Sequence, residues 1–180
     1  MKPSVLFQPL QVGSMRLENR IALTAMVTRL SGEDGVVNQA IIDRYVRFAK
    51  GEVGLIVLEA MAVHQSKSGP LLRISSDEFI PGLRELARRV HATSRSKVVP
   101  QIIHFLKVSR SGWRQTVDML SREEIRTIIR QYADAACRAR EAGMDGVELH
   151  MAHAYTLSSF LSKRANTRTD EYGRTLERRL

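Results

Sequence analysis

SREEIRTIIRQYADAACRAREAGMDGVELH, residues 121–150, holds a complete helix pattern followed by a strand, and it decides the class of the fold. Ser121 and Glu124 form a capping-box pattern, in which each side chain can bond to the backbone amide of the other residue. Behind this start, apolar residues recur at helical spacing and predict one buried stripe: Ile125, Ile128, Ile129, Tyr132, Ala136 and Ala139. Gly143 is placed to end the helix, and residues 145–150 then predict a strand.

The same alternation of strand and helix extends towards the N-terminus. Residues 97–103 (KVVPQII) predict a strand, although Pro100 counts against a central place in a sheet. Further elements are expected as a helix over residues 79–94, a buried strand over 54–60 (GLIVLEA), a helix over 37–50 and a first core strand over 20–25. Before them, residues 10–12 and 15–17 are predicted to pair as a hairpin around Gly13 and Ser14.

Strands and helices that alternate in this way build right-handed crossovers on a parallel sheet. Doubly wound sheets and (β/α)8 barrels both satisfy the pattern. Residues 24–28 (TAMVT), which follow the first strand, are not a Gly-rich phosphate turn. Their composition argues against a dinucleotide-binding Rossmann domain.

Composition indicates a globular protein. The chain has 180 residues, of which 43% are hydrophobic, and this is enough to bury a core of real size. Its one cysteine, Cys137, excludes an intrachain disulfide and fits a reducing compartment. No stretch approaches the roughly 20 apolar residues of a membrane span, and the N-terminus lacks the apolar segment of a signal peptide. A soluble, cytoplasmic protein with no membrane partner is therefore expected.

The formal net charge is +9, from 28 Lys and Arg against 19 Asp and Glu. These basic residues are spread along the helices at spacings typical of a solvated face. The one dense run, residues 174–179, has no interleaved aromatic residues on which bases could stack. The pattern argues against a nucleic-acid partner, and a phosphate-bearing cofactor or substrate accounts for part of the charge more simply.

Polar residues gather where the expected strands end, and in parallel α/β folds the active site lies at those ends. The groups are Thr24, Ala25 and Met26, then Glu59 and Ala60, then Gln101 and His104, and finally His150, His153 and Tyr155. Two imidazoles and a phenol so close together can polarise a carbonyl oxygen and deliver a proton. Two alternatives stay open: the histidines cap the strand end through hydrogen bonds, or they bind zinc, although no HExxH spacing is present.

Residues 148–179, ELHMAHAYTLSSFLSKRANTRTDEYGRTLERR, resemble the signature of the old yellow enzyme family of NADH:flavin oxidoreductases, including its 2,4-dienoyl-CoA reductase-like branch. The resemblance extends over residues 6–26 (LFQPLQVGSMRLENRIALTAM), 51–63 (GEVGLIVLEAMAV), 100–104 (PQIIH) and 141–150 (EAGMDGVELH), and so covers nearly the whole chain. It implies that residues 1–180 form the N-terminal half of an FMN-binding (β/α)8 TIM barrel, with a short β-hairpin before the first strand. Within the signature, residues 166–173 (NTRTDEYG) are expected to fix local structure rather than to take part in chemistry.

The resemblance also implies an activity. The expected enzyme is an FMN-dependent oxidoreductase that reduces an activated C=C bond, in an enone or an enoyl or dienoyl thioester, with electrons from NADH or NADPH. Cofactor-binding roles would fall to Thr24, Ala25, Met26, Ala60, Gln101 and His150. His150 and His153 would hold the carbonyl oxygen of the small-molecule substrate, and Tyr155 would donate the proton. No metal is implied.

Several positions depart from the family pattern. Val27 stands where Thr or Cys is usual near the flavin, Ala25 replaces Pro, residues 105–107 (Phe-Leu-Lys) replace Ala-Gly-Arg, and Arg174 replaces the second Gly of a pair. The expected strands also make only half a barrel, so the FMN phosphate site would lie outside the chain. One alternative is therefore a non-catalytic half-barrel or assembly subunit, whose expected partner is a second copy or the missing C-terminal half. A related enzyme with an iron–sulfur region further along a longer chain is a third alternative.

Overall fold

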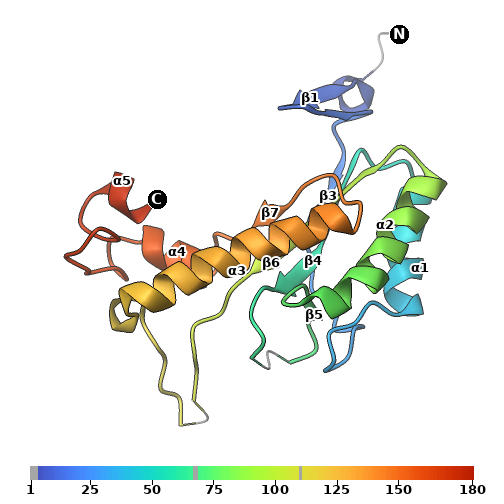
Figure 1. Cartoon of the computed structure of the whole chain (residues 1–180). Helices are drawn as coiled ribbons and strands as arrows, with labels where there is room; N and C mark the ends of the chain where they lie inside the picture. Colours follow the sequence, from blue (N-terminus) through green and yellow to red (C-terminus); the bar gives the residue numbers. More distant parts are fainter. Residues whose placement is uncertain (1–3, 67–68, 110) are drawn as a thin grey trace.

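The fold is that of a computed structural model, which describes residues 4–66, 69–109 and 111–180. Its main elements, in chain order (Figure 1), are β1 (Leu10–Val12), β2 (Met15–Leu17), β3 (Ala22–Leu23), α1 (Gln39–Lys50), β4 (Leu55–Ala62), β5 (Leu72–Arg73), α2 (Ile80–Thr93), β6 (Lys97–Ile103), α3 (Arg122–Glu141), β7 (Glu148–Leu149), α4 (Thr156–Leu161) and α5 (Leu176–Arg179). Short 3₁₀ turns add η1 (Val5–Phe7), η2 (Asp77–Phe79) and η3 (Val117–Met119). No described helix combines the length and the apolar content needed to cross a membrane.

Five strands form one parallel sheet. Its path runs β3–β4–β6–β7, and β5 pairs with the end of β4. Among the described residues β3 and β7 each pair on one side only, so the sheet is open at both edges. The arrangement confirms the predicted half-barrel of parallel strands.

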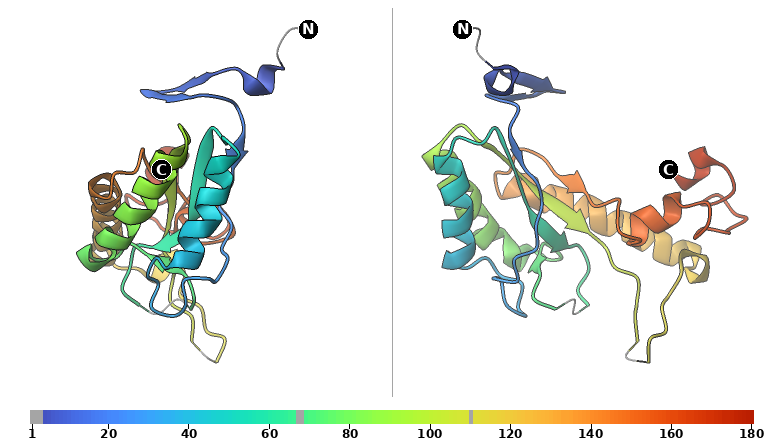
Figure 2. Two further views of the ribbon diagram at one scale, coloured as in Figure 1. Left: turned by 90° about the vertical axis from the view of Figure 1, so that its right-hand side faces the viewer. Right: turned by 180° about the vertical axis from the view of Figure 1, so that it is seen from behind.

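The predicted N-terminal hairpin is confirmed. β1 and β2 pair antiparallel, with Leu10 opposite Leu17 and Val12 opposite Met15. Gly13 in the turn has φ +57°, a conformation that glycine adopts without the steric cost of a side chain. Figures 1 and 2 show the hairpin standing clear of the sheet and its helices.

The main core lies between the sheet and helices α1, α2 and α3. Ile56 and Leu58 of β4 are fully buried in the same cluster as Tyr45 of α1 and Leu86 of α2. Helix α1 starts at Asn38, whose side-chain oxygen accepts a hydrogen bond from the Ile41 amide at 3.1 Å. An apolar stripe on each helix therefore covers the outer face of the sheet.

Helix α3 carries both predicted caps. The Ser121 amide donates to Glu124 Oε2 at 2.8 Å, and the Glu124 amide donates to Ser121 Oγ at 3.1 Å. Gly143 has φ +80° just after the helix, where its amide and the next amide bond back to the last turn. The predicted stripe is wrong at Ile129, which is 55% exposed, because it lies beyond the edge of the face that packs on the sheet. Ala135, rather than Ala136, completes the buried stripe.

A β-bulge in β4 changes which side chains face the site. The pairing register with β6 shifts between Leu58 and Met61. Leu58 and Met61 consequently both face the helices, whereas Ala60 belongs to a small cluster on the opposite face with Ala62. Bulges re-aim side chains in this way next to active sites. Periodicity in the sequence could not place Ala60, because the bulge breaks the alternation.

Two predicted strands are shorter than expected, and one is complete. Residues 20–25 and 145–150 reduce to β3 and β7. In residues 145–150, the Asp145 amide donates to the Val98 carbonyl, and the Asp145 carboxylate accepts from the Val98 amide. The side chain thus takes the place of a backbone partner in the regular pairing. β6 spans all of Lys97–Ile103 despite Pro100. Proline lacks a backbone amide on the side that faces β7, and β7 pairs with β6 only from Gln101 onward, so no pairing hydrogen bond is lost.

Candidate functional site

Six of the residues predicted for the site line one open pocket of about 890 Å³ at the carboxyl ends of the strands. These are Ala25, Ala60, Gln101, His150, His153 and Tyr155. Thr24 and Met26 do not contribute to its lining, and Met26 is 61% exposed. Strand order alone thus brings together groups that are far apart in the sequence.

The floor of this pocket is apolar and made of small side chains. Ala60 lies in a buried cluster with Leu71 and Ile103. At the rim Gln101 Nε2 donates to Glu148 Oε1 at 2.7 Å, which orients the amide. An apolar surface edged by an amide fits the ring system of the expected FMN. Among the described lining residues Arg29 is the one Lys or Arg, so this pocket offers little for a phosphate.

A hydrogen-bonded chain joins the two histidines. The Ala152 amide donates to His150 Nδ1 at 3.3 Å, so the neutral ring carries its proton on Nε2. His150 Nε2 lies 3.3 Å from His153 Nδ1 and can donate to it, which leaves His153 Nε2–H as a free donor. Burial, and then the charge of His153, lowers the pKa of His150 below its ordinary value. The lowered pKa keeps His150 neutral near pH 7, and the donor that the pair leaves free is His153 Nε2–H.

The backbone that carries His153 is strained. His153 and Ala154 both have φ +57°, a left-handed conformation that costs about 1–2 kcal/mol for a residue with a side chain. Two serines of α4 hold this loop: Ser158 Oγ donates to the Ala152 carbonyl at 2.9 Å and Ser159 Oγ to the Ala154 carbonyl at 3.0 Å. Strain that the surroundings maintain is typical of functional sites.

Tyr155 stands between the two histidines and Phe105. Its ring centroid lies 5.0 Å from that of His150 and 4.8 Å from that of Phe105, both edge to face. The hydroxyl forms no hydrogen bond with any described residue, and the side chain lines the pocket. It is therefore free to donate a proton to a ligand in the pocket.

His104, expected at the rim, has a half-buried structural position. Its Nδ1 lies 2.8 Å from Thr156 Oγ1, whose proton is donated to the His104 carbonyl at 2.9 Å, so His104 carries its proton on Nδ1. The ring packs edge to face on His64 at 4.9 Å, a contact that the sequence did not suggest. Burial, and then the charge of His64, lowers the pKa of His104 from 6.5 to about 3.

We expect the stability of the fold to depend on His104 under acid conditions. Because the folded state disfavours the charged ring, the contribution is fully present above pH 6.5 and is lost as the pH falls towards 3. Urea unfolding over this range should show a fall in the free energy of unfolding that is smaller in His104→Gln. Equal pH profiles for the two proteins would contradict the half-buried neutral histidine.

The signature segment after α4 is architectural, as predicted. Asn166 is buried and donates from Nδ2 to the carbonyls of Phe160 at 2.9 Å and Tyr172 at 2.8 Å. Arg168 donates to the Val117 carbonyl at 2.8 Å and so ties the segment to η3. The segment thereby holds its own turn and η3 together, and none of its residues lines the pocket.

A metal centre has no support in the part of the chain that the structure describes. No cluster of three or more His, Cys, Asp or Glu side chains is placed to hold an ion there. His150 and His153 bond to each other instead.

Comparison with known proteins gives a consistent result. A sequence profile of the NADH:flavin oxidoreductase / NADH oxidase family matches residues 5–114 and 106–180. The NADH oxidase of Thermoanaerobacter brockii is 36% identical over 195 residues, which cover 97% of this chain and 30% of that protein. The NADPH dehydrogenase of Bacillus subtilis is 34% identical over 189 residues, which cover 97% of this chain and 56% of that protein.

Solved structures agree with the sequence comparison. The old yellow enzyme homologue from Zymomonas mobilis superposes with a TM-score of 0.82 and 25% identity, over 97% of this chain and 56% of that one. The chain thus spans between 30% and 56% of the length of these relatives.

Proposed function

This chain belongs to the NADH:flavin oxidoreductase / NADH oxidase family, and on that premise we propose that it forms part of an FMN-dependent enzyme that reduces an activated C=C bond. The expected substrate is an enone or an enoyl or dienoyl thioester, and NADH or NADPH is the electron donor. One observation carries the proposal: His150, His153 and Tyr155 converge on a pocket that has Ala60 on its floor and Gln101 at its rim.

The residues at the base of the pocket suit the flavin ring. FMN would lie against Ala25 and Ala60, with the Gln101 amide at its polar edge and His150 beside it. Bound there, FMN supplies the transfer of hydride from the nicotinamide to the alkene. Val27 also lines the pocket and cannot hydrogen-bond to the ring, so the flavin would lack a contact that Thr or Cys provides. Contacts from Thr24 and Met26 stay predictions.

The histidine pair would bind and polarise the substrate. Neutral imidazole N–H groups that point at a carbonyl oxygen stabilise the negative charge that develops there during reduction. The low pKa of His150 keeps this residue neutral, and its Nε2–H, which lies 3.3 Å from His153 Nδ1, would turn to the substrate oxygen on binding. The strained loop at His153 sets the direction of the second donor. Both side chains would therefore orient the alkene and make it more electrophilic.

Tyr155 would complete the reaction. Reduction of a C=C bond beside a carbonyl adds hydride to the β carbon and a proton to the α carbon. The Tyr155 hydroxyl, which has no hydrogen-bond partner among the described residues, would supply that proton and regain one from water.

The names of the relatives support a nicotinamide donor without deciding which one. One is called an NADH oxidase and the other an NADPH dehydrogenase. The choice between NADH and NADPH, like the cytoplasmic location, stays a prediction.

A flavin titration followed by turnover tests the proposal. The protein is incubated with FMN, flavin fluorescence is recorded, and NADPH consumption is measured without oxygen in the presence of 2-cyclohexen-1-one. Ala60→Phe should abolish flavin binding because it fills the buried floor, whereas Ala133→Phe on the exposed side of α3 should not. Flavin binding without alkene-dependent consumption of either NADPH or NADH would contradict an ene-reductase.

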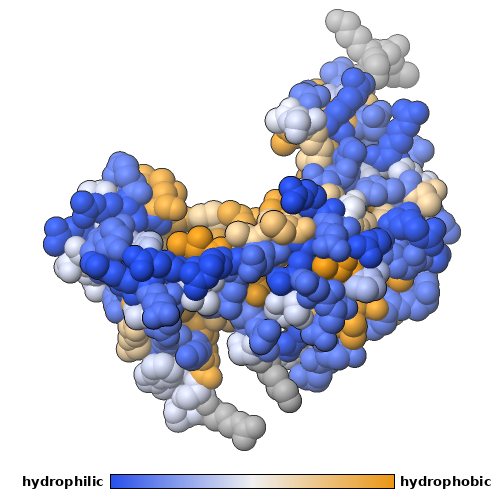
Figure 3. Space-filling model, viewed as in Figure 1, coloured by the Kyte–Doolittle hydropathy of each residue, from blue (hydrophilic) through white to orange (hydrophobic). Residues whose placement is uncertain are grey.

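A second candidate, a non-catalytic half-barrel that assembles with a partner, has one observation in its favour. The edge strands leave apolar side chains in solvent, among them Leu149 at 47% and Met151 at 42% exposure. Figure 3 shows apolar residues gathered along the upper side of α3, where β7 lies. A well-folded protein that binds no flavin and self-associates in sedimentation would favour this candidate.

A further inference from the structure

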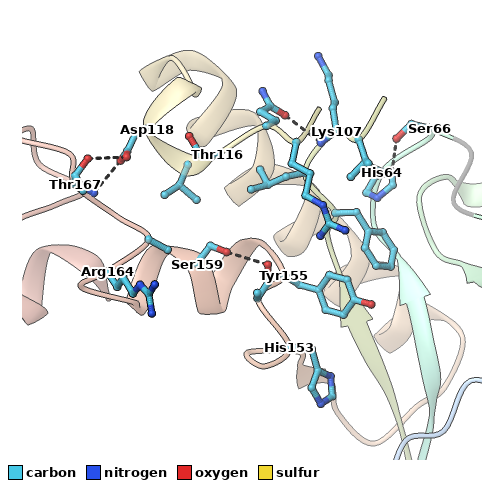
Figure 4. A pocket seen from close by; sticks show the side chains of 18 residues that line it. His64, Ser66, Lys107, Thr116, Asp118, His153, Tyr155, Ser159, Arg164 and Thr167 are labelled. Carbon is cyan, nitrogen blue, oxygen red and sulfur yellow. Dashed lines mark hydrogen bonds between the residues drawn. The ribbon is translucent and has the colours of Figure 1, made fainter. Parts of the chain in front are cut away.

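A second pocket, of about 840 Å³, opens beside the first. The two share Phe105, His153 and Tyr155, so a ligand held by the histidines can continue from one into the other. Figure 4 shows Tyr155 and His153 on one side of this second pocket and the contact between Asp118 and Thr167 on the other. Its volume lies in the range of small-molecule sites.

The lining of the second pocket is cationic. Lys107, Arg114 and Arg164 all contribute to it, and none of them forms an ion pair with a described residue. Asp118 is the one acidic residue among the described lining residues, and both its oxygens accept hydrogen bonds from Thr167, at 3.0 and 2.7 Å. Unpaired cations that border a cavity attract anionic ligands.

Local structure fixes the backbone that carries these three exposed cations. Arg114 lies opposite Val108 in an antiparallel bridge, and the Gln115 amide donates to the Lys107 carbonyl at 2.9 Å. Arg164 sits in the turn after α4, where the Ala165 amide donates to the Ser162 carbonyl at 3.2 Å. The cations therefore come from two separate segments that meet at the pocket.

We propose that Arg114 and Arg164, supported by Lys107, bind an oxyanion at the far end of the substrate, a phosphate or a carboxylate. The inference rests on the proposed function for the reacting end, which the histidines and Tyr155 would hold. It narrows the substrate to an activated alkene with an anionic group remote from the double bond. Guanidinium groups suit this task because they offer paired donors to oxyanions.

Anion binding can be tested without flavin or turnover. Backbone amide NMR shifts are followed while pyrophosphate or succinate is added at constant ionic strength. Shifts should concentrate in residues 105–109, 111–116 and 153–167, and Arg114→Gln/Arg164→Gln should weaken binding about tenfold or more. The matched variant Arg126→Gln/Arg130→Gln removes the same charge from α3, outside this pocket, and should bind as the wild type does. Tighter binding of pyrophosphate identifies a phosphate, and tighter binding of succinate a carboxylate.

Two outcomes would overturn the proposal. Equal weakening in both double variants would mean that the protein responds only to overall charge. Loss of FMN binding with retained riboflavin binding in Arg114→Gln/Arg164→Gln would assign the pocket to the flavin phosphate instead of the substrate. Failure of alkene reduction alone, with anion binding intact, would count against the proposed function and leave the anion site standing.

Discussion

Replacement of Tyr155 by phenylalanine is expected to slow alkene reduction in the flavin-loaded enzyme by about 100-fold or more, since a positioned general acid contributes roughly 10²–10⁴-fold. The ring contacts with His150 and Phe105 are retained, because only the hydroxyl is removed. That hydroxyl bonds to no described residue, so the fold should lose little stability. Reduction of the flavin by NADPH needs no proton from Tyr155 and should keep its rate.

Stopped-flow absorbance separates the two half-reactions. The flavin is first reduced with NADPH, and its reoxidation is then followed with 2-cyclohexen-1-one. Tyr172→Phe is the matched control, because this tyrosine packs with Leu120 and Ile125, away from the histidines. If Tyr155→Phe reoxidises as fast as the wild type, another group donates the proton.

Replacement of Leu86 by alanine is expected to cost about 3 kcal/mol in the free energy of unfolding. Leu86 is fully buried in the core between the sheet and its helices, so truncation removes apolar contacts and leaves a cavity. A loss of this size is a large fraction of the stability of a small domain. Urea unfolding monitored by circular dichroism measures it.

Ile129→Ala is the control for Leu86→Ala. Periodicity assigns both side chains to buried stripes, but Ile129 is 55% exposed in the structure. Its truncation should change the free energy of unfolding by no more than about 0.5 kcal/mol. A cost comparable to that of Leu86→Ala would show that a partner or a second copy covers the outer side of α3.

Much of the fold could be predicted because its signals are local. The capping box at Ser121 and Glu124, the turn at Gly13 and the Schellman end at Gly143 each depend on residues within one turn of the chain. The order of strands and helices then limits the topology, since parallel crossovers have one hand. Strand order also predicted that Gln101, His150 and Tyr155 meet at one rim.

Other features needed the tertiary structure, because they depend on contacts between distant segments. The lengths of β3 and β7 are set by pairing with their neighbours rather than by apolar runs. The loop at His153 keeps a left-handed backbone only because serines of α4 hold its carbonyls.

From its sequence alone, this protein could be assigned its elements, their order and the residue types at the strand ends, because periodicity and capping act within a few residues. Only the tertiary structure decided that a bulge turns Ala60 towards the pocket, that His104 packs against His64, and that Arg114 and Arg164 border one cavity. Burial and charge proximity are properties of the packed molecule, and residues far apart in the chain determine them together.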